Sequence, residues 1–516
     1  MNDLENLYRQ RLNQFDTERK ALGQKMHRLG NVRVFLFVCM VLCLLQFFSS
    51  NFEVLAWWWL FLATVPFFAY LVKIHQKIFE QKELMDQLCL INEKEKEEQN
   101  TNLAQFDGGA VFADAGHAYA ADVDLFGANS LYAHLNRCVT ANGKTQLAQL
   151  FKHQLPSVEA ILGQQRAVQA LSKQVDFRQN FMAKGRLTED SVADTAFIQA
   201  WSTADNKLVH QVSWKLIRVL MPIMGIAALV YFLWSFEYQA LLIVATINFV
   251  LLGLQSKYLN QQHVDISKRQ KVLQMYTSLL DLVGQQSFEQ DPSLNALKQT
   301  ATAAQQSFQQ LSTIIKYFDQ RLNIFIGLGL NLIILYDIQC IFALEKWKKR
   351  YANQLPDWIK AVAKVDVLNS LATFLYNHPT YTFPQVKISD HAYVKSKALG
   401  HPLIDPKTRI ASDTYIDQHQ IYIVTGSNMA GKSTFLRTVA LNVLLAQCVA
   451  PVCAQNFDCS FMQILTSMRV QDSINQQTSY FQAELLRLQY ITQQLEQNRP
   501  TFVILDEILK GTNSED

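Results

Sequence analysis

The sequence has little net charge and few cysteines, and its cysteines do not show the spacing of a metal-binding site. Its 516 residues carry 47 Lys and Arg against 44 Asp and Glu, a formal net charge of +3. Such a chain lacks the global basic field that marks many nucleic-acid-binding proteins. The eight cysteines form no C-x-x-C pair, so neither disulfides nor zinc is expected. His117 and His134 are expected to be structural or exposed, because no partner at ligand spacing accompanies them.

The segment 421–437, IYIVTGSNMAGKSTFLR, carries the strongest functional signal. Four mostly apolar residues at 421–424 predict a short buried strand, and 426–433 match the phosphate-loop spacing G-x-x-x-x-G-K-S. In such a loop, backbone N–H groups surround a triphosphate, the lysine reaches the outer phosphates and the serine hydroxyl binds Mg²⁺. The helix that follows points its positive end at the same anion. The predicted ATP-binding residues are Gly426, Ser427, Asn428, Met429, Ala430, Gly431, Lys432, Ser433 and Thr434.

A second predicted strand ends in an acidic pair. The apolar run 501–505 is typical of a central parallel strand, and Asp506 and Glu507 follow it. Asp506 is expected to hold Mg²⁺ together with Ser433, and Glu507 to orient and deprotonate the attacking water. The alternative is an ordinary strand end capped by two acids. With the upstream loop, the pair predicts an ATPase that uses ATP and Mg²⁺, with Glu507 and Lys432 as catalytic residues.

These motifs resemble those of the MutS family of DNA mismatch repair ATPases. The decapeptide TGSNMAGKST at 425–434 is similar to the family's TGPNMGGKST, with Ala430 in place of a glycine. Leu505-Asp506-Glu507 followed by Gly511-Thr512 resembles LDEIGRGT, and SYFQAE at 479–484 resembles STFMVE. The resemblance covers about 118–516, with weaker motifs before 420.

The resemblance implies partners and parts beyond the loop. Ser479 would reach the γ-phosphate across the interface of a homodimer, although a helix N-cap is the local alternative for this serine. The family's ATPase domain continues with further strands, a switch histidine and a dimerisation tail after the point where Asp516 stands. The sequence is therefore expected to be either a fragment or naturally incomplete. The family's mismatch-reading domain has no counterpart here, because a hydrophobic hairpin occupies its place.

Long hydrophobic segments are the other prominent feature. They form two pairs, 34–48 with 54–72 and about 219–234 with 240–254. A helix of about 20 residues crosses the ~30 Å hydrocarbon core, so we predict transmembrane hairpins at 31–73 and 216–255. The alternative is four buried core helices. Three consecutive tryptophans at 57–59 and apolar residues on every helical face favour lipid contact.

Positive charges give the orientation of both hairpins. Lysines and arginines flank each hairpin, and the two short loops inside them contain none. Both hairpins are therefore predicted to enter from the cytoplasm and return, which makes this a multi-pass inner-membrane protein with a cytoplasmic ATPase domain. A fifth apolar stretch lies at 322–344, and crossing there would place Lys432 outside the cell. We predict a long core helix instead, with Asn323, Asn331 and Asp337 facing polar neighbours.

The predicted fold class is an α/β P-loop (ABC-type) ATPase domain preceded by an all-α lever or core domain, with two transmembrane helical hairpins. The predicted domains are a cytosolic amphipathic helix at 1–30, a hairpin at 31–73, a helical stalk at 74–106, a core and lever domain at 107–380 interrupted by the second hairpin at 216–255, and the ATPase domain at 381–516.

The predicted function is a membrane-anchored ATPase that binds ATP and DNA. The resemblance implies mismatched or branched DNA, and coupling of dimer closure to movement of the lever helices. A membrane scaffold or transporter-like protein that uses ATP without binding DNA is the main alternative, although 476–481 lacks the LSGGQ pattern of transporter ATPases. A non-hydrolysing anchor protein is a third. The predicted partners are ATP, DNA, the lipid bilayer and a second copy of the chain.

Overall fold

The computed structural model describes most of the chain, in two compact units. The described residues are 2–50, 54–98, 103–114, 116–153, 155–288, 291–417, 421–427, 430–468 and 480–508. The amino-terminal unit comprises residues 1–105 with 182–187, and the second unit comprises residues 106–181 with 188–516.

The elements follow the chain in the order α1 (Asn2–Ser49), α2 (Leu55–Glu98), η1 (Ala110–Phe112), α3 (Leu131–Leu135), α4 (Ala141–Lys152), α5 (Val158–Ser172), α6 (Val175–Arg186), α7 (Val192–Thr203), α8 (Val212–Ser235), α9 (Gln239–Ser267), α10 (Gln270–Gln285), α11 (Pro292–Asp319), η2 (Gln320–Leu322), α12 (Ile324–Ile334), α13 (Tyr336–Tyr351), α14 (Leu355–Asn377), β1 (Gln385–Lys387), β2 (Val394–Leu399), β3 (Ser412–Ile416), α15 (Lys432–Gln447), β4 (Asn456–Ser460), β5 (Gln463–Ser467), α16 (Tyr480–Leu495) and β6 (Thr501–Leu505).

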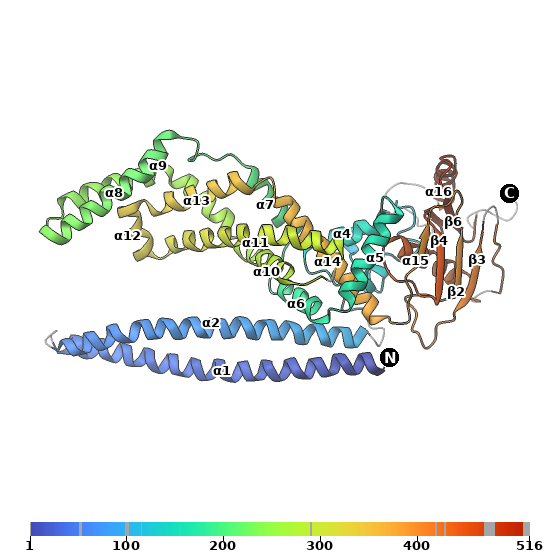
Figure 1. The fold of residues 1–516 in the computed structure, drawn as a ribbon, viewed down its shortest axis with the longest axis horizontal. Coiled ribbons are helices and arrows are strands. Elements are labelled where there is room, and N and C mark those ends of the chain that lie inside the picture. The colour runs from blue at the N-terminus through green and yellow to red at the C-terminus, as the bar shows by residue number, and fades with distance from the viewer. Residues whose placement is uncertain are drawn as a thin grey trace. The chain divides into compact units, whose positions relative to one another are not determined.

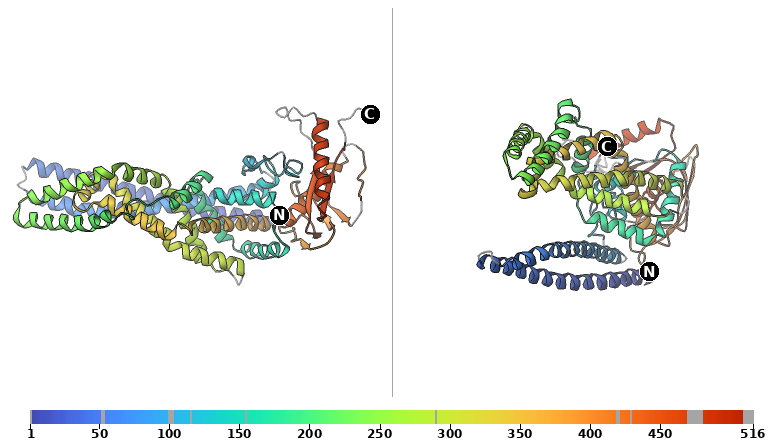
Figure 2. Two further views of the ribbon diagram at one scale, coloured as in Figure 1. Left: turned by 90° about the horizontal axis from the view of Figure 1, so that it is seen from above. Right: turned by 60° about the vertical axis from the view of Figure 1, so that its left-hand side comes forward.

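The amino-terminal unit is a hairpin of two long helices. α1 and α2 run side by side in opposite directions (Figure 1), and Figure 2 shows the same pairing from two other directions. In the polar half, Arg19 Nη1 of α1 lies 3.7 Å from Asp86 Oδ1 of α2. In the apolar half, the rings of Phe47 and Trp58 lie 5.4 Å apart. The predicted amphipathic helix and the first hydrophobic segment are thus one continuous helix.

In the described part of the chain, four helices are long and apolar enough to cross a membrane. They are α1, α2, α8 and α9, and a fifth candidate arises if α12 and α13 are counted together. Large apolar side chains on these helices are exposed, among them Phe35 at 69% and Trp234 at 83%. Exposed apolar surface of this extent indicates contact with lipid or protein. Insertion of the two predicted hairpins remains a prediction, because length and composition alone support it.

α14 is the central helix of the second unit and is buried on almost every face. It packs against α4, α5 and α11. Its Asp366 Oδ2 accepts hydrogen bonds from Thr140 N at 2.8 Å and Thr140 Oγ1 at 2.7 Å, and the carboxylate also accepts from Val139 N. A Cβ on Gly143 would lie 2.3 Å from Asp366 Oδ2, so only glycine lets α4 approach this carboxylate. Asp366 therefore fixes the start of α4 against α14.

Asp366 is expected to make stability depend on pH. Burial raises its pKa to about 7, against the opposing effect of hydrogen bonds from Thr140 and Val139. In the unfolded chain an aspartate has a pKa of about 3.9, so between about pH 4 and 7 the folded state holds an extra proton. Stability from this group is therefore lost as pH rises through that window. In Asp366→Asn, the slope of unfolding free energy against pH should change by up to about 1.4 kcal/mol per pH unit.

Urea unfolding of the detergent-solubilised full-length chain between pH 4.5 and 7.5 measures this slope. Asp357→Asn is the matched control, because Asp357 lies on the same helix and is exposed. Identical slopes for wild type and Asp366→Asn would contradict the assignment.

The apolar stretch 322–344 is not one helix, so the prediction of a long core helix there was wrong. α12 and α13 meet at an angle of 82°, and the residue between them, Leu335, has a left-handed φ of +53°. Asn331 and Asp337 have the polar neighbours that were expected. Asn331 Oδ1 accepts from Asp337 N at 2.9 Å, and the Asp337 carboxylate lies 3.0 Å from Arg321. One residue outside the helical region is enough to redirect the chain.

The strands form two sheets in the carboxyl-terminal part. β1, β4, β2 and β3 lie in that order, with β1 parallel to β4 and β2 antiparallel to both neighbours. β5 and β6 form a separate parallel pair. β4, β2 and β3 are visible side by side in Figure 1. α15 packs against β1 and β2, which places this helix beside the mixed sheet.

The predicted fold class was wrong. A P-loop (ABC-type) ATPase domain needs a central parallel strand leading into the loop, and residues 421–424 form none. Ile421 is 91% exposed and Ile423 is 82% exposed. A strand forms only where a neighbouring strand pairs with it, and this segment belongs to neither sheet of the described residues. The described part of the chain is predominantly helical with six short strands, and its apolar helices are candidate spans only.

Candidate functional site

The position that joins the glycine-rich loop to α15 requires a glycine. Gly431 caps the amino terminus of α15 with φ of +89°, a region where residues with a side chain are strained. Phe435 N donates to Gly431 O at 2.9 Å, which closes the first turn. The first N–H groups of a helix have no intrahelical acceptor and form its positive end. In this chain they belong to Lys432, Ser433 and Thr434, three of the predicted phosphate ligands.

The ammonium group of Lys432 lies over the loop. Its Nζ donates to Gly426 O at 2.7 Å and to Ser427 O at 3.5 Å. Ala430 N donates to Ser427 O at 3.2 Å, which makes a turn in the same segment. The cation and the helix terminus therefore face the same short loop, an arrangement suited to an anion. Asn428 and Met429 lie outside the described residues, and their predicted roles remain predictions.

The acidic pair follows β6 as expected from the sequence. β6 lies parallel to β5, and Asp506 N extends the pairing by donating to Ser467 O at 2.9 Å. Glu507 has φ of +46° and is exposed. Hydrogen bonds and ion pairs of the described residues do not join Asp506 to Lys432 or Ser433. The loop and the acidic strand end thus belong to separate elements, because the strand expected at 421–424 is not formed.

Ser479, the residue predicted to act across the dimer interface, lies outside the described residues.

α16 begins directly after Ser479, and Arg487 on this helix is half-buried. Its Nε donates to Thr466 O at 2.9 Å, and its Nη2 donates to His117 O at 3.0 Å and to Ala118 O at 2.5 Å. Arg487 thereby joins α16 to β5 and to the segment that precedes the helical region.

Removing this guanidinium is expected to loosen α16. Arg487→Met keeps the apolar stem but removes the guanidinium that donates to three carbonyl oxygens, and we expect a loss of about 1–3 kcal/mol. Hydrogen exchange should accelerate in residues 116–119 and 482–495. Arg499→Met is the control, since Arg499 is exposed. Unchanged exchange in both segments would show that Arg487 does not hold them together.

Two further contacts join the carboxyl-terminal elements to the helical region. Arg437 Nη1 of α15 lies 3.4 Å from Asp124 Oδ2, and Thr466 Oγ1 of β5 donates to the Asp122 carboxylate. These contacts were not predicted from the sequence. The only available signal was the pair of acids in an otherwise apolar segment.

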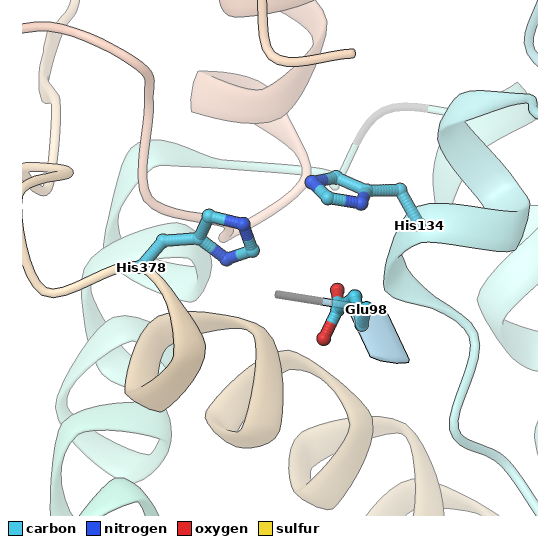
Figure 3. A group of neighbouring side chains, drawn as sticks. All are labelled: Glu98, His134 and His378. Atoms are coloured by element: carbon cyan, nitrogen blue, oxygen red, sulfur yellow. The ribbon is translucent and has the colours of Figure 1, made fainter. Parts of the chain in front are cut away.

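His134 and His378 form a close pair. Their ring centroids lie 4.8 Å apart (Figure 3), and His378 Nδ1 lies 2.9 Å from Phe374 O. Burial, followed by the charge of His378, lowers the pKa of His134 well below its usual value. The Glu98 side chain in the same view belongs to the amino-terminal unit, and two histidines alone are too few for a structural metal centre. His134 is buried, and the expectation that it is structural or exposed, and no metal ligand, remains a prediction.

Comparison with known proteins finds similarity in the segment that contains the loop and the acidic pair. Residues 422–516 match the family model of MutS domain V. The DNA mismatch repair protein MutS of Acetivibrio thermocellus is 33% identical over 171 residues, covering 32% of this chain and 19% of that protein. The DNA mismatch repair protein MSH3 of Meyerozyma guilliermondii is 35% identical over 166 residues, covering 31% of this chain and 17% of that protein.

A third relative gives a similar result. MutS of Thermus thermophilus is 31% identical over 179 residues, which cover 34% of this chain and 21% of that protein. The chain therefore spans about a fifth of the length of the curated relatives it matches.

Proposed function

Because this chain is a member of the MutS family, we propose that it is a membrane-anchored protein that binds ATP and acts on DNA. The observation that carries the proposal is the Lys432 ammonium lying 2.7 Å from Gly426 O directly before the free N–H groups of α15. This arrangement favours a phosphate. The curated relatives are DNA mismatch repair proteins, which supports mismatched or branched DNA as the nucleic acid.

The proposed roles of the site residues follow from their chemistry. Lys432 exchanges its contacts with Gly426 O and Ser427 O for the outer phosphates of ATP. Ser433 and Asp506 would hold Mg²⁺, which neutralises phosphate charge when bound. Glu507 orients and deprotonates water as a general base. Closure of a homodimer brings Ser479 of a second copy to the γ-phosphate and moves the loop toward the acidic pair.

The contacts between the site and the helical region support a lever mechanism. Arg437 on α15 lies at Asp124, and Arg487 on α16 holds the carbonyl oxygens of 117 and 118. A shift of either helix on nucleotide binding would therefore pull on residues 117–124 directly. These residues precede α3, the first α-helix of the helical region.

Membrane anchoring is proposed through the α1–α2 and α8–α9 hairpins. All four helices are long and apolar enough to span a bilayer, and their exposed apolar side chains need a non-aqueous neighbour. Basic residues flank both hairpins, while the loops inside them contain none. The positive-inside rule then places the remaining residues, including Lys432, in the cytoplasm at the inner membrane.

Loss of the loop lysine tests the nucleotide site. In Lys432→Ala, we expect ATP to bind about 10- to 100-fold more weakly, because hydrogen bonds to charged groups contribute about 1.5–3 kcal/mol. Calorimetric titration of the solubilised full-length chain with ATP and Mg²⁺ measures the affinity. Lys407→Ala is the control, since Lys407 is an exposed lysine in the same part of the chain. An unaltered affinity in Lys432→Ala would remove the nucleotide assignment.

DNA binding needs a separate measurement. Electrophoretic shift of homoduplex, mismatched and four-way-junction DNA by the full-length protein, with and without ATP, should show an ATP-sensitive complex. No shift with any of the three would remove the DNA part of the proposal. Retained ATP binding would then favour a membrane scaffold that moves its hairpins, a function that the four candidate spans also suit.

A further inference from the structure

α12 is a short and very apolar helix with an exposed surface. Its sequence IFIGLGLNLII contains one polar side chain, Asn331. Leu328 is 55% exposed, and Leu322 just before the helix is 70% exposed. An 11-residue helix is about 16 Å long, roughly half of the ~30 Å hydrocarbon core. α12 is therefore too short to cross a bilayer and long enough to reach its middle.

α12 packs against both helices of the second hairpin. A Cβ on Gly225 of α8 would lie 1.9 Å from Ile333 O, so glycine allows direct contact between the two backbones. Gly225 lies seven residues beyond Arg218, about 10 Å along α8, and Asn248 lies nine residues before Lys257, about 13 Å along α9. Both contacts thus lie well inside the apolar parts of the hairpin.

Asn248 supplies hydrogen bonds where α12 ends. Its Nδ2 donates to Leu332 O at 2.7 Å and to Ile333 O at 3.4 Å, and the residue is fully buried. The last carbonyl oxygens of a helix lack intrahelical donors, and hydrocarbon has no water to replace them. A buried amide in the middle of an apolar helix is unfavourable unless it is bonded in this way. Asn248 satisfies two carbonyl groups that a break at Leu335 exposes.

The residues at the other end of α12 are strongly polar. Arg321 Nη2 donates to Asn260 Oδ1 at 2.9 Å, and it also lies 3.0 Å from Asp337 Oδ2 on α13, so this ion pair links the start of α12 to the far side of the bend at Leu335. Asp319 Oδ1 accepts from Ser267 Oγ at 2.6 Å and lies 3.0 Å from His263 Nε2. On α9 these contacts are at 260–267, beyond the apolar segment. This end of α12 therefore lies at the level of the membrane surface when the hairpin is inserted.

We infer that α12 and the bend at Leu335 form a re-entrant membrane element, in which α12 enters the bilayer beside the α8–α9 hairpin and α13 returns to the same side. The inference rests on the proposed anchoring of that hairpin. Such an element contacts lipid without changing the number of crossings, so Lys432 stays on the side predicted for it. α12 connects α11 to α13 (Figure 1), so this connection would run through the bilayer.

Lipid photolabelling tests the inference with the unmodified chain. Full-length protein is reconstituted into vesicles of phosphatidylcholine and phosphatidylglycerol that contain a phosphatidylcholine with a diazirine at the end of one acyl chain. After irradiation, mass spectrometry should find label in 324–334 at a yield comparable to that in α8 and α9, with little in α10. Label in α8 and α9 but not in α12 would overturn the re-entrant element and leave the anchoring intact. No label in α8 and α9 would overturn the anchoring itself.

Asn248 is a positioning residue in this arrangement, and its role has its own readout. In Asn248→Leu, backbone amides of 327–335 should exchange faster in the reconstituted protein, and the labelling of α12 relative to α8 should fall. Thr246→Val is the matched control, because Thr246 is exposed and its hydroxyl donates within its own helix, to Leu242 O. Wild-type exchange and labelling in Asn248→Leu would overturn the role of this side chain.

Discussion

Replacing Glu507 by Gln is expected to lower the rate of ATP hydrolysis by about 10²- to 10⁴-fold while ATP still binds, because a positioned general base contributes rate enhancement of that size. The amide keeps the shape of the side chain but does not take a proton from water. Glu507 follows β6 in a left-handed backbone conformation, which turns the chain directly after Asp506. Phosphate release measures turnover, and retention of radiolabelled ATP on a filter measures binding.

The control for this variant is Glu496→Gln at the exposed end of α16, which should hydrolyse ATP at the wild-type rate. Equal background rates in wild type and Glu507→Gln would favour a non-hydrolysing anchor protein. Loss of ATP binding in Glu507→Gln would mean that the carboxylate holds the nucleotide and is not the base.

Removing the Glu345 carboxylate is expected to destabilise the helical region by about 1–3 kcal/mol for each buried donor that it leaves without an acceptor. This buried side chain of α13 accepts hydrogen bonds from three consecutive backbone N–H groups, those of Lys207, Leu208 and Val209, and from Tyr258 Oη at 2.6 Å. Glu345→Ala leaves all four donors without their acceptor. Glu345 on α13 would then no longer bind the loop before α8 and the polar end of α9. Urea unfolding followed by circular dichroism measures the change.

Glu345→Gln separates the hydrogen bonds from the packing. The amide retains one acceptor oxygen and nearly the same volume, so its loss should be smaller than that of the alanine variant. Two equally destabilised variants would mean that the negative charge is essential, and two unaffected variants would contradict the structural role. Either result is read against Glu189→Ala, a substitution of an exposed glutamate in the same unit.

The long apolar helices and the local turn at the glycine-rich loop could be predicted from the sequence. The apolar segments 34–48, 54–72, 219–234 and 240–254 all lie within long helices, and the strand expected at 501–505 is β6. Gly431 has the positive φ that a glycine-rich loop needs before a helix. These features depend on neighbours in the chain, so composition and spacing were enough to predict them.

Features that depend on residues far away in the sequence could not be predicted from the sequence. The segment 421–424 has the composition of a buried strand, but a strand forms only where another strand supplies hydrogen bonds. The stretch 322–344 has the composition of one helix, and its break is stabilised by Asn248 and Gly225, about 85 and 110 positions earlier. No local pattern marks these two residues as contacts of Ile333. The same holds for Arg487, whose acceptors lie about 370 positions away.

The hydrogen bond between Thr140 and Asp366 has a consequence for biogenesis, because it joins residues 226 positions apart. α8 and α9 lie between them, so both emerge from the ribosome before α14 is made. If the hairpin integrates as proposed, it does so while α4 still lacks its capping carboxylate. Assembly of the helical region is then a late, post-insertion event. A translation intermediate arrested before residue 366 should be membrane-integrated and yet sensitive to protease in α4 and α5.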